Sequence, residues 1–446
     1  MIELPSKTSS GRAAALEVLF SKRPLLPLII ITLLGLFAYS NTFDAPFQMD
    51  DRHFFSKKNP VISDLSSYIE PSKTKGHILH DALITRYVGY MSFAVNYKVH
   101  GLDVKGYHVV NFTIHILNSL LVYFLVLYTF KTPFLSSSTL SKSSGYIALF
   151  TGMLFVTHPV QTEAVTYVFQ RLASFMSFFY LLSIVFYIRW RLDEKRPSAA
   201  AGFIYFWRAN LLYILSLISA IAAMKTKENA FTLPFVVALY EHLFFSGPFK
   251  NRLALITPHL LTLLIIPATI IGFDHPIAEA ISGIGYSGIP RGDYLFTQMR
   301  VVITYMRLLV FPVNQNFYYD YPIYHSFLTP EVFLSFLFLL AVGAAGVCLF
   351  QRSKFKAPEL RIMAFGIFWF FIVLSVESSI IPVQMVINEY RVYLPSAGAM
   401  MAVTTGVYLL SERFGSRGAR KAAIAFLWLL PLLLAFATYE RNIVWH

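Results

Sequence analysis

Cysteine is almost absent from this sequence, since Cys348 is the only one among 446 residues. It lies inside an apolar stretch, so a disulfide framework, a thiolate metal site and a thiol redox function all lack support. Charged residues are scarce at 14% of the chain, and neither a Gly-rich nucleotide-binding loop nor an internal repeat is apparent. The cellular compartment must therefore be inferred from topology.

The chain is instead rich in apolar residues, which make up 56% of it. With so few charges, this composition is typical of integral membrane proteins and excludes a single soluble core. The formal net charge is +13. However, Lys and Arg form short clusters between apolar runs, where membrane topology explains them better than nucleic-acid binding does. We therefore expect no nucleic-acid partner.

The apolar runs predict the fold class. A membrane span needs about 20 apolar residues, and this criterion predicts an all-α polytopic membrane protein with about eleven transmembrane helices. The predicted spans lie near 24–41, 107–130, 145–158, 166–189, 203–224, 229–246, 252–272, 329–350, 360–376, 392–411 and 421–438. The third is the shortest. We expect one membrane domain over residues 1–446.

The charges between the spans predict the orientation. Lys7, Arg12, Lys22 and Arg23 precede the first span and no convincing cleavage site follows it, which predicts an uncleaved signal anchor. Four basic clusters fall on the same side as the N-terminus, at 189–196, 250–252, 351–356 and 411–421. By the positive-inside rule this side is cytoplasmic, and the C-terminus lies outside.

Two long segments, 42–106 and 273–328, then lie on the outer face. In the second, polar residues recur at helical spacing and give an otherwise apolar helix one polar face: Thr297, Arg300, Thr304 and Arg307. We expect an interfacial or re-entrant helix there, and a similar membrane-hugging stretch at 71–97.

Asp50 and Asp51 follow the first span directly, in the stretch FQMDDRHFF. One interpretation is a solvated loop start or a helix cap. The other is catalytic, because a carboxylate that is partly desolvated by Phe47, Phe54 and Phe55, with a second carboxylate beside it, has a raised proton affinity. Such a group accepts a hydroxyl proton during group transfer.

A second group of candidates follows the short third span, in THPVQTEAVTYVFQRLAS. Glu163 and Arg171 either bridge each other, or Arg171 grips the phosphate of a lipid carrier with two hydrogen bonds. A metal site built from His158 and Glu163 matches no zinc spacing. A divalent metal is therefore unsupported, and we assign no metal ligands.

Further ionisable residues fall on the same predicted face. Lys227 and Glu228 occupy the turn between the fifth and sixth spans, against the positive-inside trend. Anion binding explains them, and so does a self-compensating surface pair. Glu389 and Arg391 lie at the mouth of the tenth span, where ionisable groups favour a functional hypothesis.

Arg300 and Arg307 join this set, so that ionisable residues from five separate segments converge on one membrane face. Carboxylates that activate an acceptor hydroxyl, with Arg and Lys that stabilise a departing lipid phosphate, suit glycosyl transfer from a polyprenyl-phosphate sugar. A transporter or lipid-glycan flippase would instead place ionisable residues at mid-membrane between inverted repeats. An inactive membrane scaffold is a third alternative.

Several stretches together resemble one family: FQMDDRHFFSKKNPVI, GYHVVNFTIHILNSLLVY, FVTHPVQTEAVTYVFQRLAS, AMKTKENAFTLPFVVALYE, RLLVFPVNQNFYYDYP and NEYRVYLPSAG. In this order, over nearly the whole chain, they resemble the TMTC-type protein O-mannosyltransferases and their bacterial relatives. The resemblance implies the GT-C glycosyltransferase superfamily, an eleven-span fold, a polyprenyl-phosphate sugar donor and an acidic motif in the first outer loop.

The same resemblance implies roles for individual residues. The Asp50–Asp51 pair matches the acidic motif, with Asp50 favoured as the base and inversion at the sugar. Arg171, Lys227 and Arg391 fall in segments that match the donor-phosphate side, and the roles of Glu228 and Glu389 stay open.

The family also implies the acceptor and the compartment. We expect transfer of one sugar, mannose by resemblance, to protein Ser/Thr, with a lipid or glycan acceptor as the alternative. TMTC-type chains continue beyond a segment like YERNIVWH into tetratricopeptide repeats, and this sequence stops there. Low cysteine content and short outer loops favour a prokaryotic cell membrane, or the endoplasmic reticulum membrane for a eukaryotic chain.

Overall fold

The computed structural model describes residues 25–193, 203–271, 288–355, 357–383, 385–413 and 416–446. Within these residues every regular element is a helix and no strand occurs, as the predicted all-α class requires. Some predicted features lie wholly or partly outside the described residues: Lys7, Arg12, Lys22, Arg23, the second outer segment at 273–328 and the basic clusters at 189–196, 351–356 and 411–421.

The long helices coincide with the predicted spans. They are α2 (Leu26–Ala38), α8 (Val104–Thr129), α9 (Ser144–Thr157), α11 (Arg171–Arg191), α12 (Phe203–Met224), α13 (Leu233–Phe244), α14 (Phe249–Leu261), α15 (Ile265–Ile271), α18 (Pro330–Ser353), α19 (Leu360–Leu374), α20 (Tyr393–Arg413) and α21 (Arg417–Asn442). The seventh predicted span corresponds to α14 and α15, which the 3₁₀ turn η7 (Thr262–Leu264) joins.

Helix length and hydropathy confirm a polytopic membrane protein. Six helical stretches among the described residues are long and apolar enough to cross a membrane: Val104–Thr129, Val168–Arg191, Phe249–Thr269, Pro330–Ser353, Glu389–Arg413 and Gly418–Trp445. Shorter apolar helices are Leu26–Ala38, Ala209–Met224 and Leu360–Leu374. The count of eleven spans and the orientation stay predictions.

Helix α9 lies inside the bundle. It contacts α2, α8, α20 and α21, and every residue from Tyr146 to Thr157 is buried. Because neighbouring helices cover all of its faces, α9 needs no polar side. This environment explains why the shortest predicted span carries no charged residue.

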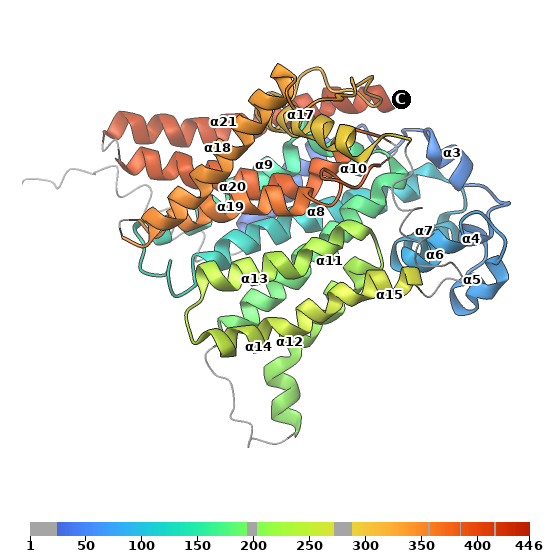
Figure 1. Ribbon diagram of the computed structural model, residues 1–446, viewed down its shortest axis with the longest axis horizontal. Coiled ribbons are helices and arrows are strands. Elements are labelled where there is room, and N and C mark those ends of the chain that lie inside the picture. The colour runs from blue at the N-terminus through green and yellow to red at the C-terminus, as the bar shows by residue number, and fades with distance from the viewer. Residues whose placement is uncertain (1–24, 194–202, 272–287, 356, 384, 414–415) are drawn as a thin grey trace, which may run out of the picture.

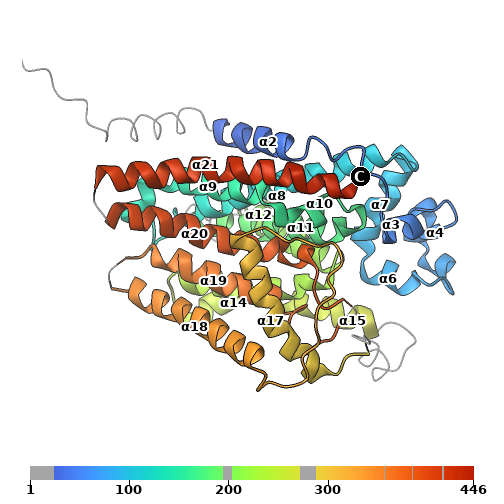
Figure 2. The same cartoon turned by 90° about the horizontal axis from the view of Figure 1, so that it is seen from above.

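Short helices gather at one end of the bundle together with the C-terminus, as Figures 1 and 2 show. They include α3 (Asp50–Phe54), α4 (Pro60–Ser63), α5 (Ser66–Ile69), α6 (His80–Thr85), α7 (Tyr87–His100) and α10 (Thr162–Val165). The 3₁₀ turns η1 (Pro71–Thr74), η3 (Pro159–Gln161), η4 (Val168–Gln170), η6 (Glu228–Thr232), η8 (Glu389–Val392) and η9 (Ile443–Trp445) belong to the same connecting segments. We call this end the Asp50 end.

A cluster of buried aromatic side chains lies beneath α3, and we call it the aromatic platform: Phe54, Phe55, Tyr90, Phe93 and Tyr107. The ring centroids of Phe54 and Phe93 are 5.4 Å apart, and those of Phe55 and Tyr107 are 4.8 Å apart. Edge-to-face pairs at such distances favour a fixed arrangement. The platform joins α3 to α7 and α8.

The stretch 71–97, predicted to lie along the membrane, forms η1, α6 and most of α7. Helix α7 packs against α4 and α11, so part of this stretch belongs to the protein interior. Its backbone also bonds to the segment between α12 and η6, because the Val88 amide donates to the Lys225 carbonyl at 2.9 Å.

Helix α17 (Arg291–Val310) is the helix expected from the polar residues at helical spacing, and it runs obliquely to α20 and α21 in Figure 2. Its polar side chains contact protein. Arg300 donates to the Ser335 hydroxyl at 3.1 Å, and the hydroxyls of Thr304 and Tyr321 lie 2.9 Å apart. The polar face therefore packs against α18 and the segment that follows α17.

Helices α19 and α20 approach each other through two glycines. A Cβ atom at Gly366 would overlap the Gly398 carbonyl oxygen, and one at Gly398 would lie 2.7 Å from the Gly366 carbonyl oxygen. Backbone atoms cannot move aside as a flexible side chain does, so this contact requires glycine on both helices.

We expect Gly366→Ala to destabilise the bundle by about 1–3 kcal/mol, because the added methyl group forces α19 and α20 apart. The measurement is the melting temperature of the purified protein in detergent. Gly343→Ala in α18 is the matched control, since a Cβ atom there meets nothing within 4 Å. Equal melting temperatures for the two variants would contradict the close contact.

Candidate functional site

Asp51 anchors the acidic turn to the rest of the protein. Its side chain is 1% exposed, and its carboxylate accepts hydrogen bonds from the Phe169 amide at 2.8 Å and the Gln48 amide at 3.2 Å. Burial, and to a smaller extent the neighbouring Asp50, raises the pKa of Asp51 to about 7, although these backbone donors act to lower it. Asp51 thus ties α3 to η4.

Asp50, by contrast, is exposed. Its amide donates to the Tyr167 hydroxyl at 3.3 Å, and its carboxylate interacts with the same hydroxyl. The preceding residue, Met49, has a φ of 41°, a conformation that non-glycine residues rarely adopt and that the surrounding structure must enforce. Of the two adjacent carboxylates, only Asp50 is available to a substrate.

Arg171 is fully buried beneath this turn. Its guanidinium donates to the side-chain oxygens of Asn111 and Asn96 and to the carbonyls of Ser92 and Tyr107. It also lies over the Phe93 ring, 4.6 Å from the centroid. Protein acceptors therefore occupy its donors, and Arg171 holds the aromatic platform together instead of facing an open site.

The interpretation in which Glu163 and Arg171 bridge each other does not match the described contacts. Glu163 is 4% exposed and accepts from the Tyr390 amide at 2.9 Å. Burial, and then the neighbouring Glu389, raise the pKa of Glu163 to about 8. Glu163 is therefore bonded to the backbone of η8 and not to Arg171.

Glu389 is fully buried. Its carboxylate accepts hydrogen bonds from the Gln315 side chain, from the Asn316 amide at 3.1 Å and from the Tyr319 hydroxyl. These three donors belong to the segment that follows α17. Glu389 therefore clamps residues 315–319 onto η8.

Lys227 and Arg391 meet around one carboxylate. The Lys227 ammonium lies 3.1 Å from Glu377 and 4.1 Å from the centroid of the Tyr390 ring. The Arg391 guanidinium donates to the Val386 carbonyl at 3.0 Å and to the Met385 carbonyl, and it interacts electrostatically with Glu377.

This group, which we call the cationic cluster, is buried and carries one more positive than negative charge. Lys227, Glu377 and Arg391 are each less than 9% exposed. The Nε atom of Arg391 and the Oε2 atom of Glu377 have no hydrogen-bond partner among the described atoms. Buried polar atoms without partners are rare in proteins, and an excess cation in such a place suits an anionic ligand.

The Lys227–Glu228 pairing considered from the sequence does not form, because each residue has another partner. Glu228 accepts from Arg86 at 2.9 Å, and both side chains are about one-third exposed. Arg86 precedes α7, and Glu228 belongs to η6. Arg86 thus connects the start of α7 with η6.

Three residues of this site had no predicted role: Arg86, Tyr167 and Glu377. Arg86 and Glu377 stand alone in stretches without other charges, ITRYVGY and LSVESSII. An isolated ionisable residue at a membrane boundary is a functional signal, and that signal was available for both. Tyr167 lies in the same predicted stretch as Glu163 and Arg171, but only the tertiary structure brings its hydroxyl to Asp50.

His158 lies at the end of α9 and is buried. Its Nδ1 atom accepts from the Val160 amide at 3.2 Å, and its Nε2 atom lies 3.1 Å from the Leu309 carbonyl. Both ring nitrogens are therefore engaged by the backbone. Within the described residues, no group of three or more His, Cys, Asp or Glu side chains is arranged to hold a metal ion.

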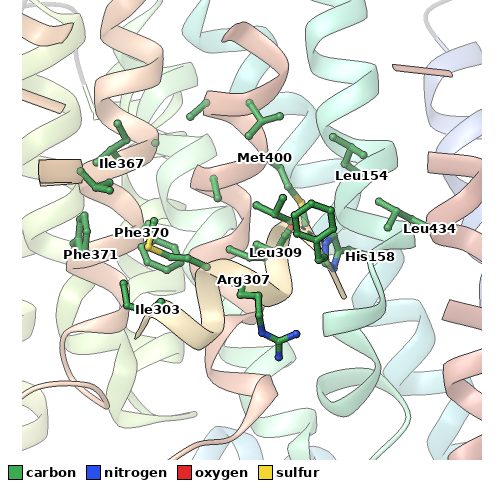
Figure 3. A pocket seen from close by; sticks show the side chains of 18 of the residues that line it. Leu154, His158, Ile303, Arg307, Leu309, Ile367, Phe370, Phe371, Met400 and Leu434 are labelled. Carbon is green, nitrogen blue, oxygen red and sulfur yellow. Dashed lines mark hydrogen bonds between the residues drawn. The ribbon is translucent and has the colours of Figure 1, made fainter. Parts of the chain in front are cut away.

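A cavity of about 560 Å³ lies between α9, α17, α18, α19, α20 and α21. Apolar side chains line it except for His158 and Arg307. Figure 3 shows the Arg307 guanidinium directed away from Met400 and Leu154. It donates to the Val313 carbonyl at 2.8 Å. The cavity thus offers apolar walls and one cation, and Arg300 is not among the residues that line it.

We expect Arg171→Ala to destabilise the protein by about 3 kcal/mol or more, because it leaves several buried acceptors without donors. Arg189→Ala is the matched control, since Arg189 belongs to the same helix and is exposed. Thermal unfolding in detergent measures both. A normal melting temperature for Arg171→Ala would contradict the structural role of Arg171.

We expect the free energy of unfolding to fall as the pH rises from about 5 to 8. The folded protein retains a proton on Glu163 up to a pKa of about 8, whereas the unfolded chain releases it near 4.5. Asp51 acts in the same direction, up to about 7. Glu163→Gln should therefore flatten the dependence of melting temperature on pH, and Glu70→Gln, at an exposed position, should not. An unchanged slope for Glu163→Gln would refute the assignment.

Comparisons with known proteins identify relatives. The Drosophila melanogaster protein O-mannosyl-transferase Tmtc3 is 25% identical over 412 residues, which cover 80% of this chain and 42% of the fly protein. Human protein O-mannosyl-transferase TMTC1 is 24% identical over 80% of this chain and 42% of its own length. A Caenorhabditis elegans protein O-mannosyl-transferase is 23% identical over 94% of this chain and 56% of its own.

This chain therefore spans about two-fifths to three-fifths of the length of these relatives. No family model and no solved structure matches it. The relatives named here are animal proteins and lend no support to the expected prokaryotic membrane. The names of these relatives and the extent of the matches confirm the resemblance that the motifs indicated. The chain is consistent with membership of the TMTC-type protein O-mannosyltransferase family.

Proposed function

We propose that this protein is an integral-membrane glycosyltransferase that moves one sugar, mannose by analogy with its relatives, from a polyprenyl phosphate to a protein Ser/Thr hydroxyl at the outer face. The observation that carries the proposal is the division between the two aspartates. Asp51 is buried and bonded to backbone amides, which leaves the adjacent Asp50 exposed and held in a fixed turn. A preorganised carboxylate of this kind suits a general base.

In the proposed reaction the acceptor oxygen attacks the anomeric carbon of the sugar while Asp50 takes the hydroxyl proton. The bond between the anomeric carbon and the phosphate oxygen breaks, and the lipid phosphate leaves with the electron pair. A single displacement inverts the configuration at that carbon. Proton removal by a positioned base contributes about 10²- to 10⁴-fold to such a rate.

The cationic cluster is our candidate for stabilising the departing phosphate. Lys227 and Arg391 share one carboxylate, Glu377, so positive charge is left over for an anion. A fixed cation in a water-poor site stabilises developing negative charge more strongly than the same cation in water. We assign Arg171 no phosphate contact, because its donors are already bonded to protein.

A lipid-linked donor is supported by the apolar cavity beside α17. Its walls suit a hydrocarbon chain, whose burial is favourable in proportion to its area. The names of the relatives favour a protein acceptor over a lipid or glycan acceptor.

We expect Asp50→Asn to lower sugar transfer by at least about 100-fold while the melting temperature stays unchanged, because an amide cannot accept the hydroxyl proton. The assay follows radiolabel from polyprenyl-phosphate mannose to a Ser/Thr peptide pool and, separately, to a glycolipid pool. Asp44→Asn is the matched control, since Asp44 is an exposed carboxylate that pairs with Lys105. Wild-type transfer by Asp50→Asn would disprove the assigned base.

We expect Lys227→Gln to raise the KM for the lipid donor about 10-fold, because it removes the positive charge that remains for the phosphate. Lys225→Gln serves as the control, since Lys225 lies two residues away and contacts Thr269 instead. Donor titrations at saturating peptide measure this effect. An unchanged KM for Lys227→Gln would remove the cationic cluster from the donor site.

A further inference from the structure

We propose that Tyr167 is a positioning residue for Asp50, and that the clamped segment 315–319 holds Tyr167 in place through Phe317. This inference rests on the proposed function, because it concerns how the assigned base is aimed. It also gives a role to Glu389, a buried carboxylate that the proposed mechanism does not use.

The first step is the contact between Tyr167 and the base. The Tyr167 hydroxyl accepts a hydrogen bond from the Asp50 amide at 3.3 Å and also interacts with the Asp50 carboxylate. One hydroxyl thus bonds to the backbone of Asp50 and interacts electrostatically with its side chain. The Asp50 side chain is exposed, so without this contact its carboxylate would sample several rotamers.

The second step is the support of the Tyr167 ring, which is 4% exposed. It stacks on Trp445 with centroids 5.8 Å apart and meets the Phe317 edge at 5.4 Å. Phe317 and Trp445 in turn contact each other at 4.8 Å and 85°. Three rings that each contact the other two leave Tyr167 little freedom to tilt.

The third step is the anchorage of Phe317. Glu389 bonds to residues on both sides of it, namely Gln315, Asn316 and Tyr319. Asn314, at the start of this segment, adopts a φ of 55°, which marks a sharp turn after α17. The clamp therefore presents Phe317 to Tyr167 at a fixed position.

Together these contacts form a continuous path from Glu389 through Phe317 and Tyr167 to Asp50. Both ends of the path lie at the site: Glu389 adjoins Tyr390, which packs on Lys227, and Asp50 is the assigned base. The segment that follows α17 thus sets the orientation of the base from the side of the cationic cluster. A small displacement of a catalytic group is costly, since an error of about 1 Å lowers rates up to about 100-fold.

The test is steady-state sugar transfer by Tyr167→Phe, Phe317→Leu and the double variant, with Tyr68→Phe as control. Tyr68 lies at the same end, and its hydroxyl donates to the Val61 carbonyl at 2.7 Å. We expect Tyr167→Phe to lower kcat by about 10- to 100-fold with an unchanged donor KM.

Phe317→Leu should change kcat in the same direction, and the double variant should lose no more than the larger single loss, because both residues act through one path. Tyr68→Phe should keep the wild-type kcat. A normal kcat for Tyr167→Phe, a raised donor KM in place of a lowered kcat, or additive losses in the double variant would overturn the inference. Asp50→Asn separates the two hypotheses: its full activity would refute the proposed base, whereas an inactive Asp50→Asn beside a normal Tyr167→Phe would refute only the positioning role.

Discussion

The burial of the Asp51 carboxylate against the backbone of η4 is the constraint on which the site depends. Removing a carboxylate from water is costly unless hydrogen-bond donors compensate, and the Phe169 and Gln48 amides supply them. This contact fixes the start of α3 above the aromatic platform, and Arg171 fixes the platform from beneath. The Asp51 side chain points into the protein, whereas the side chain of its neighbour Asp50 is exposed.

The structure offers two kinds of environment. One is ionic: the cationic cluster and the Arg86–Glu228 pair hold charge in partly or fully buried places. The other is apolar: the cavity beside α17 has hydrocarbon walls apart from His158 and Arg307. A donor with a phosphate and a long hydrocarbon chain needs both environments, and this correspondence favours a lipid-linked sugar over a soluble one.

Much of the architecture was predictable from the sequence. Each apolar run near the length of a span is a helix, because a backbone in lipid must satisfy its own hydrogen bonds. The convergence of Asp50, Glu163, Lys227 and Glu389 was also predictable, since consecutive spans alternate in direction and bring alternate connections to the same end. The partners of these residues were not, because Tyr390, Glu377 and residues 315–319 are distant in sequence and reach them only through packing.

The sequence by itself determined the class of the protein, the position of its helices and the end of the bundle that carries the ionisable residues. These follow from local hydropathy and from the spacing of charges along the chain. The tertiary structure alone decided which charge is free: Arg171 is enclosed by acceptors, and Asp51 is bound to backbone whereas Asp50 is exposed. The physical reason is that burial and hydrogen-bond saturation depend on neighbours from other segments, and no pattern along one segment specifies them.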